Sequence, residues 1–218
     1  MSWVITGSQP IPAVIGEPFG GGYFAGYISH TADGNPTHAL IVAPRGGVEP
    51  GATGTGYTLT DMLQWKLSAT NHDVTSLFNG YANTQSLISA GIADFPAAEF
   101  CVNLSIGGYT DWYLPARYEL EIAYFNLKPS TGVNTTSFGA NPYSVPRLLN
   151  NYTANYPLRT FVPLFAGGSE SFVADWHTSS SCSGNSSWWV RFSDGLPTSS
   201  GTGLFTPQRV RAFRRIAL

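Results

Sequence analysis

The chain has 218 residues, a net charge of −2, and 11% charged against 43% hydrophobic side chains. This length and apolar content predict one domain with a substantial core, and the near-neutral charge excludes chain-wide attraction to nucleic acid or anionic membranes. No apolar run approaches the roughly 20 residues of a membrane span, and the N-terminus lacks a signal peptide pattern, so we expect neither membrane insertion nor signal-directed export.

Aromatic residues make up 14% of the chain and accompany 24 glycines and 15 prolines. This composition favours short strands joined by tight turns, in an α+β or mostly β domain. With few charges, solubility must come from Ser, Thr, Asn, Gly and Tyr. Such a surface suits extracellular recognition of sugars.

The N-terminal residues 1–20 are rich in Pro and Gly and are interpreted as an extended arm, followed by one domain over 21–218. Strands are expected over 23–29 and 38–44. The turn between them, 32–36, contains an Asp-Gly pair that favours positive backbone angles, so a hairpin is predicted.

The middle of the chain predicts a strand over 62–67 and then helices. Apolar residues recur at helical spacing over 83–104, where Pro96 is expected to break or kink the run. A further helix should begin near Pro115, because its buried stripe recurs at i, i+3, i+4 and i+7: Leu120, Ala123, Tyr124 and Leu127.

The remainder predicts a long surface excursion over 130–170 and then an antiparallel sheet. Strands are expected over 172–178, 188–193 and 208–216, with Ser/Gly/Asn-rich loops between them. The last strand contains the chain's cluster of basic residues, interpreted as one strand face: Arg209, Arg211, Arg214 and Arg215.

Metal and redox chemistry have weak sequence support. Cys101 and Cys182 are the only cysteines; Cys101 is expected in the core, and pairing of the two is left open. The histidines are scattered without metal-ligand spacing. The oxygen-bearing candidates for calcium are better explained by turn chemistry: Asp33, Asn35 and Asp194. We expect no cofactor and no metal.

The segment 107–120 reads Gly-Gly-Tyr-Thr-Asp-Trp-Tyr-Leu-Pro-Ala-Arg-Tyr-Glu-Leu. It resembles the GG-x-x-DWYLP-x-x-x-EL signature of domains at the tips of bacteriophage tail fibres, a branch of the C-type-lectin-like and formylglycine-generating-enzyme-like folds. Weaker similarities follow in family order, at 21–28, 39–44, 63–66, 96–101, 175–180, 188–195 and 209–214. The chain departs from the family's Y-W-S-S-T element through Asp175 and His177, on either side of Trp176.

This resemblance implies a C-type-lectin-like α+β fold, with two helices packed on a mostly antiparallel sheet and long loops. It implies a virion protein, made in the host cytoplasm, that binds a host glycan or outer-membrane receptor, contacts other tail proteins and forms a homo-oligomer, expected to be a trimer. The final-third loops would carry the receptor-binding face.

Sugar binding requires a flat aromatic ring and short polar side chains, and the final third supplies both. On alternating strand geometry, only one of Trp188 and Trp189 can face the core; which one is left open. The proposed receptor-binding residues are His177, Ser179, Ser183, Asn185, Ser186, Trp188, Thr202 and Phe205.

Two other functional classes compete with receptor binding. A hydrolase built from Asp175, His177 and Ser179 is disfavoured because neighbouring strand residues point to opposite faces and no G-x-S-x-G elbow exists. Glu119, Glu121 and Asp111 are better explained as cap and helix-surface residues than as glycosidase carboxylates. A virion structural or adaptor protein, docking through its arm, remains the alternative to a receptor-binding protein.

Overall fold

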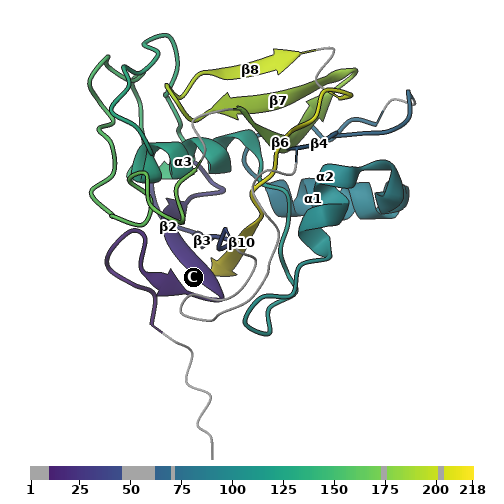
Figure 1. The fold of residues 1–218 in the computed structure, drawn as a ribbon, viewed down its shortest axis with the longest axis horizontal. Coiled ribbons are helices and arrows are strands. Elements are labelled where there is room, and N and C mark those ends of the chain that lie inside the picture. The colour runs from purple at the N-terminus through teal and green to yellow at the C-terminus, as the bar shows by residue number, and fades with distance from the viewer. Residues whose placement is uncertain (1–9, 46–61, 70–71, 173–175, 201–203) are drawn as a thin grey trace, which may run out of the picture.

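The protein combines helices with two curled sheets in an α+β arrangement (Figure 1). The computed structural model describes residues 10–45, 62–69, 72–172, 176–200 and 204–218. Within these ranges the helical elements are α1 (Gly80–Gly91), the 3₁₀ turn η1 (Ile92–Asp94), α2 (Pro96–Val102) and α3 (Arg117–Leu127).

The strands of the described residues divide into two sheets. The first has the order β1 (Pro18–Phe19), β2 (Gly22–Ile28), β3 (His38–Val42) and β10 (Phe213–Ala217), with β5 (Ser144–Val145) also pairing with β2. The second has the order β4 (Met62–Leu63), β9 (Gln208–Arg209), β6 (Trp176–Ser183), β7 (Ser186–Arg191) and β8 (Pro197–Ser200). Strands pair antiparallel except at the β6 and β9 contact, which is parallel.

The predicted first hairpin is confirmed: β2 and β3 pair antiparallel, with Ile28 opposite His38. Gly34 in the connecting turn has a φ of 91°, a backbone angle that glycine adopts without the steric cost of a Cβ. The predicted strand at 62–67 is shorter, because only Met62 and Leu63 pair with a neighbour.

The helical run divides where the sequence indicated. Asn79 caps α1 by accepting a hydrogen bond from the amide of Ala82 at 2.9 Å. The run then breaks after η1, and Pro96 occupies the first turn of α2, where its missing amide costs nothing. Cys101 is buried on α2 and Cys182 is buried on β6; both are free thiols.

The motif segment, residues 107–120, follows α2, runs into α3 and contacts β10 of the first sheet through Tyr113. Gly107 and Gly108 have φ values of 58° and 80°, as a type I′ turn requires, and Tyr109 closes that turn against Ile106. Further along, Asp111 forms an ion pair with Arg214 of β10. The glycine pair and the aspartate therefore have structural roles.

Glu119 is the buried carboxylate of this motif. It accepts hydrogen bonds from the amides of Ala116 at 2.7 Å and Gly80 at 3.1 Å, and from the Tyr113 hydroxyl at 2.8 Å. These contacts confirm its expected capping role and tie the start of α3 to the start of α1. Burial raises the pKa of Glu119 to about 7.

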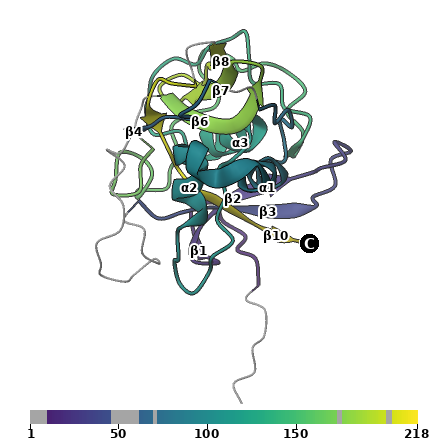
Figure 2. The ribbon, with the colours of Figure 1, turned by 90° about the vertical axis from the view of Figure 1, so that its right-hand side faces the viewer.

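The predicted apolar stripe of α3 is confirmed, since Leu120, Ala123, Tyr124 and Leu127 are all fully buried. The helix contacts β2 of one sheet and β6 and β7 of the other, so it fills the space between them. Both ribbon views show the helices between the two sheets (Figures 1 and 2). Glu121, expected on the helix surface, is instead buried at 1% exposure beside Arg117.

The final third differs from the prediction in two places. The serine-rich segment expected to be a loop belongs to β6, and only a short turn at Gly184 and Asn185 separates β6 from β7. The expected last strand is interrupted between β9 and β10, so its two parts enter different sheets.

The interruption also corrects the prediction that the arginines form one strand face. Arg211 is fully buried; its guanidinium donates to the Ala43 carbonyl at 2.5 Å and pairs with Glu170 at 2.9 Å. An arginine at this depth is stabilised by a carboxylate and a carbonyl that satisfy its donors. None of the helices in the described part of the chain is long and apolar enough to cross a membrane.

Candidate recognition surface

The β6–β7 hairpin brings together the polar tip residues proposed for receptor binding. Ser183 and Ser186 pair across the turn. Ser183 and Asn185 are exposed, and Ser186 is partly exposed. Gly184 has a φ of 58°, and its amide donates to the Asp73 carboxylate at 2.5 Å. The tip is thus held in place by a segment outside the hairpin.

The two neighbouring tryptophans separate as strand alternation predicted. Trp189 is 8% exposed; its indole donates to Ser187 Oγ at 3.0 Å and packs edge-on against Trp176. Trp188 is partly exposed and lies over the Arg117 guanidinium, 4.4 Å from its carbon to the ring centroid. The structure therefore assigns the outward tryptophan as Trp188.

His177 and Ser179 do not belong to this surface, which corrects their proposed receptor-binding role. Both are fully buried, and the His177 ring packs 4.7 Å from Phe192 and 5.4 Å from Phe172. The reason is that β6 lies against α1 and α3, so its serines are covered by helices rather than facing solvent.

The remaining proposed residues lie apart from the hairpin tip. Phe205 is 41% exposed, but its backbone carbonyl accepts from Gln64 next to β4, on the other side of β6 from Trp188. Thr202 lies outside the described residues. The proposed set is thus reduced to Ser183, Asn185, Ser186 and Trp188 as one group.

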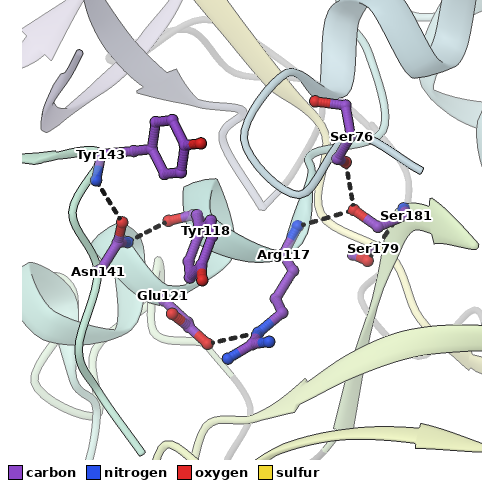
Figure 3. A network of polar contacts seen from close by, with 8 residues as sticks. All are labelled: Ser76, Arg117, Tyr118, Glu121, Asn141, Tyr143, Ser179 and Ser181. Carbon is purple, nitrogen blue, oxygen red and sulfur yellow. Dashed lines mark hydrogen bonds and ion pairs between the residues drawn. The ribbon is translucent and has the colours of Figure 1, made fainter. Parts of the chain in front are cut away.

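Arg117, at the start of α3, contacts the Trp188 ring with its guanidinium. Figure 3 shows its polar contacts with Glu121 and Ser181. Its Nε donates to Glu121 at 2.8 Å, and its backbone amide donates to Ser181 Oγ at 3.3 Å. Ser181 in turn donates to the Ser76 carbonyl at 2.8 Å. These bonds fix the guanidinium as a rigid support beneath the exposed indole.

A row of partly exposed rings continues from Trp188 through residues distant in sequence. Arg117 also lies 5.0 Å from the Tyr118 ring, and Tyr118 lies 5.4 Å from Tyr143. Tyr143 is held by its amide donating to Asn141, as Figure 3 shows, and stacks on Phe78 at 4.2 Å. We call Trp188, Tyr118, Tyr143, Phe78 and His30 the aromatic row.

The far end of the row carries titratable groups. His30 lies 5.3 Å from Phe78 and 4.5 Å from His38, and Arg215 approaches its Nε2 at 3.4 Å. Burial and electrostatic coupling to His38 and Arg215 lower the pKa of His30 to about 4. Burial and the charge of Arg215 lower the pKa of His38. Both rings are therefore neutral at pH 7.

The oxygen atoms considered as calcium ligands serve local structure. Asp33 accepts from the Asn35 amide at 2.9 Å and from its side chain at 3.1 Å, and these bonds hold the pKa of Asp33 below its ordinary value. Asp194 pairs with Arg191. Within the described ranges, no group of three or more His, Cys, Asp or Glu side chains is placed to hold a metal ion.

Comparisons with known proteins give no match to a protein-family model and none to a curated protein. The surface must therefore be interpreted from its own residues. Sequence reasoning missed Arg117, Tyr118, Tyr143 and Phe78. Arg117 and Tyr118 lie within the motif 107–120, and the high aromatic content was a general signal for the rings, but no spacing rule brings together residues so far apart in the chain.

Proposed function

We propose that this protein is a C-type-lectin-like receptor-binding domain of a phage tail fibre, which attaches the virion to a polysaccharide on the host surface. The motif resemblance supports the family and the virion setting. The observation that carries the binding role is the partly exposed Trp188, supported by Arg117 and next to the serine and asparagine side chains of the hairpin tip. The proposal assigns no catalytic step to the protein.

The chemistry of this surface suits a glycan. An indole ring covers the apolar face of a pyranose, and short hydroxyl and amide side chains bond its hydroxyl groups at small entropic cost. Arg117 keeps the indole in place before the ligand arrives, because the guanidinium is fixed by Glu121. Preorganisation of this kind reduces the cost of ordering side chains on binding.

The first test is Trp188→Ala, which we expect to lower adsorption of the labelled protein to susceptible cells. Folding should survive, because a partly exposed ring over an arginine contributes about 1 kcal/mol beyond its buried area. The matched control is Tyr109→Ala. Tyr109 is 36% exposed and also lies over an arginine, Arg214 at 3.9 Å, but it is not in the aromatic row.

Enzymatic removal of the surface polysaccharide from the cells completes the test. Binding that disappears with the polysaccharide, and that Trp188→Ala but not Tyr109→Ala weakens, supports the proposal. Unchanged adsorption of a folded Trp188→Ala protein, or equal binding to stripped cells, contradicts it.

A tail-tip adaptor that binds virion proteins, without contacting the host, is the second candidate. It is favoured by a pocket of about 390 Å³ where the described chain begins, lined by apolar residues that include Ile11, Phe19 and Leu218. Residues near the predicted end of the arm belong to the fold, since Phe19 is buried in the core and pairs within the first sheet. The deletion that tests assembly should therefore stop at residue 9. Loss of virion assembly with adsorption intact would favour the adaptor.

The expected trimer and the virion location belong to the same proposal. Light scattering of the purified protein measures the oligomer directly. Antibody labelling of virions would place the protein on the particle. A protein absent from purified virions would contradict both candidates.

A further inference from the structure

A pocket of about 570 Å³ lies between the C-terminal end of α3 and the long excursion that follows it. Its volume falls within the roughly 300–1,000 Å³ typical of small-ligand sites. The segment Leu158 to Phe161 forms one wall, and Lys128 and Asn155 also line it. None of these residues belongs to the aromatic row, so the pocket is a separate feature.

The walls of the pocket are fixed by hydrogen bonds to Lys128. Its ammonium group donates to the Gly132 carbonyl at 2.5 Å, to Asn134 Oδ1 at 2.6 Å and to the Pro157 carbonyl at 3.3 Å. The Thr160 amide donates to the Lys128 carbonyl at 2.9 Å. Thr160 is thereby held inward, and its two neighbours in the chain are exposed.

The pocket carries positive charge on Lys128, which Asp194 balances in part without a direct ion pair. Lys128 is 2% exposed, and in the described part of the chain no carboxylate lies within ion-pair distance of its ammonium group. Burial lowers the pKa of Lys128, and the negative charge of Asp194 opposes part of this effect. An anion in the pocket would relieve this cost.

Arg159 supplies free donors at the same wall. It is exposed, and its guanidinium makes no hydrogen bond, ion pair or ring contact with the described residues. Lys128 and Arg159 are the charged residues of the pocket lining, and both are basic. Because a guanidinium matches a carboxylate with two parallel hydrogen bonds, Arg159 is suited to a carboxylate ligand.

Phe161 gives the pocket an open aromatic face. Its side chain is 89% exposed, although burying a phenylalanine typically gains about 1.5–3 kcal/mol. A ring left this exposed beside a pocket is typical of a surface that becomes covered on binding. The neighbouring Thr131, Asn155 and Thr160 offer short polar groups within the same lining.

From this geometry we infer a second binding site, which takes a carboxylated saccharide such as a uronic acid unit of an acidic polysaccharide. The carboxylate pairs with Arg159 within the positive field of Lys128, the sugar ring packs on Phe161, and its hydroxyl groups bond Asn155 and Thr131. Charge complementarity selects the acidic sugar, and the polar groups of Asn155, Thr131 and Thr160 within a largely apolar lining give its hydroxyl groups partners that a fatty acid would not use. The site goes beyond the proposed function, because it shares no residue with the aromatic row.

The test titrates the full-length protein with trigalacturonic acid and with its neutral methyl ester, using calorimetry and saturation-transfer NMR. We expect the acid to bind and to weaken as salt rises, while the ester binds at least tenfold more weakly. Arg159→Gln should weaken binding of the acid by about 10- to 100-fold, and Phe161→Ala should weaken binding and reduce saturation transfer to the sugar ring protons.

Matched control variants show whether the binding belongs to this pocket. Arg147→Gln changes another exposed arginine and Leu149→Ala another exposed apolar side chain, 64% exposed; neither should alter binding. Trp188→Ala should also leave it unchanged, so failure of the aromatic row and failure of the pocket are distinguishable. Thermal melting checks that every variant folds.

Three results would overturn the inference. The first is absence of binding by both trigalacturonic acid and the sialic acid probe 3′-sialyllactose. The second is equal affinity for the acid and its ester. The third is binding of laurate in a Phe161-dependent way that neither sugar displaces, which would make the site a lipid pocket.

Discussion

The buried carboxylate of Glu119 should be the most sensitive polar position of the motif. Glu119→Ala removes the acceptor of three buried donors, the amides of Ala116 and Gly80 and the Tyr113 hydroxyl. Each unsatisfied buried donor costs about 1–3 kcal/mol, and loss of the desolvated carboxylate returns part of that cost. We expect the free energy of unfolding to fall by about 3–6 kcal/mol.

Glu119→Gln and a control glutamate make the prediction specific. The glutamine oxygen can still accept from both amides, and the Tyr113 hydroxyl can turn to accept from its NH₂ group, so we expect a loss of at most about 2 kcal/mol. Glu99→Ala changes a partly buried glutamate in the first turn of α2 and should cost less than about 1 kcal/mol.

Urea unfolding followed by tryptophan fluorescence measures these differences, and thermal melting checks them. A loss of about 3–6 kcal/mol in a chain of this length corresponds to a drop in Tm of roughly 6–24 °C. The reasoning is refuted if Glu119→Ala unfolds within about 1 kcal/mol of Glu99→Ala. It is also refuted if the alanine and glutamine variants are equally stable.

Three further predictions concern pH and backbone strain. Burial raises the pKa of Glu121 to about 7 from 4.5, so the folded protein holds this proton at pH values where the unfolded chain has lost it. The free energy of unfolding, measured by urea titration, should therefore fall as pH rises from about 5 to 8, and Glu121→Gln should reduce this pH dependence. The pKa of His30 is lowered to about 4 from 6.5, so the unfolded chain takes up this proton at a higher pH than the folded protein does. The free energy of unfolding should therefore fall as pH drops from about 6.5 to 4. His30→Asn should remove about 1–2 kcal/mol of this loss, after allowance for solvent screening. Gly195→Ala places a Cβ 2.3 Å from the Tyr124 ring at a φ of 73°, and should lower the free energy of unfolding by about 2–5 kcal/mol. The control Gly184→Ala should lower it by about 1 kcal/mol, because φ is 58° there and nothing lies within 4 Å. Equal melting temperatures of the two variants would contradict this prediction.

Local patterns predicted the parts of the fold that local physics determines. The Asp-Gly turn gave the first hairpin, and the spacing of Leu120, Ala123, Tyr124 and Leu127 gave the buried face of α3. Both depend on residues within a few positions of each other. Composition left an α+β or a mostly β domain open, and the helical spacing in the middle of the chain favoured α+β.

Burial of polar residues could not be predicted in the same way. Ser179 and Ser181 look like loop residues in sequence, yet both are fully buried, and Ser181 bonds the Ser76 carbonyl across the interior. Arg211 is buried, where it forms an ion pair with Glu170, which is distant in the sequence. Such positions depend on tertiary partners that no sequence period reveals.

The recognition surface contains one feature that follows from local sequence pattern and others that depend on tertiary contacts. Strand alternation predicted that one of Trp188 and Trp189 faces outward, and the structure selects Trp188. Its support by Arg117 and its continuation through Tyr118 and Tyr143 depend on how α3 and the excursion lie beside β7. The sequence thus narrowed the outward ring to two neighbouring tryptophans, but it did not reveal the surface around that ring.

The pairing of other arginines with carboxylates makes the exposed Arg159 informative. Several other arginines of the described chain are committed to carboxylates: Arg117 to Glu121, Arg191 to Asp194, Arg211 to Glu170 and Arg214 to Asp111. The chain has 13 Asp and Glu residues against 11 Lys and Arg residues, so a lack of carboxylates does not explain why Arg159 has no such partner among the described residues. An arginine that has no carboxylate partner among the described residues, beside an exposed phenylalanine and a buried lysine, therefore supports an anionic ligand supplied from outside the protein.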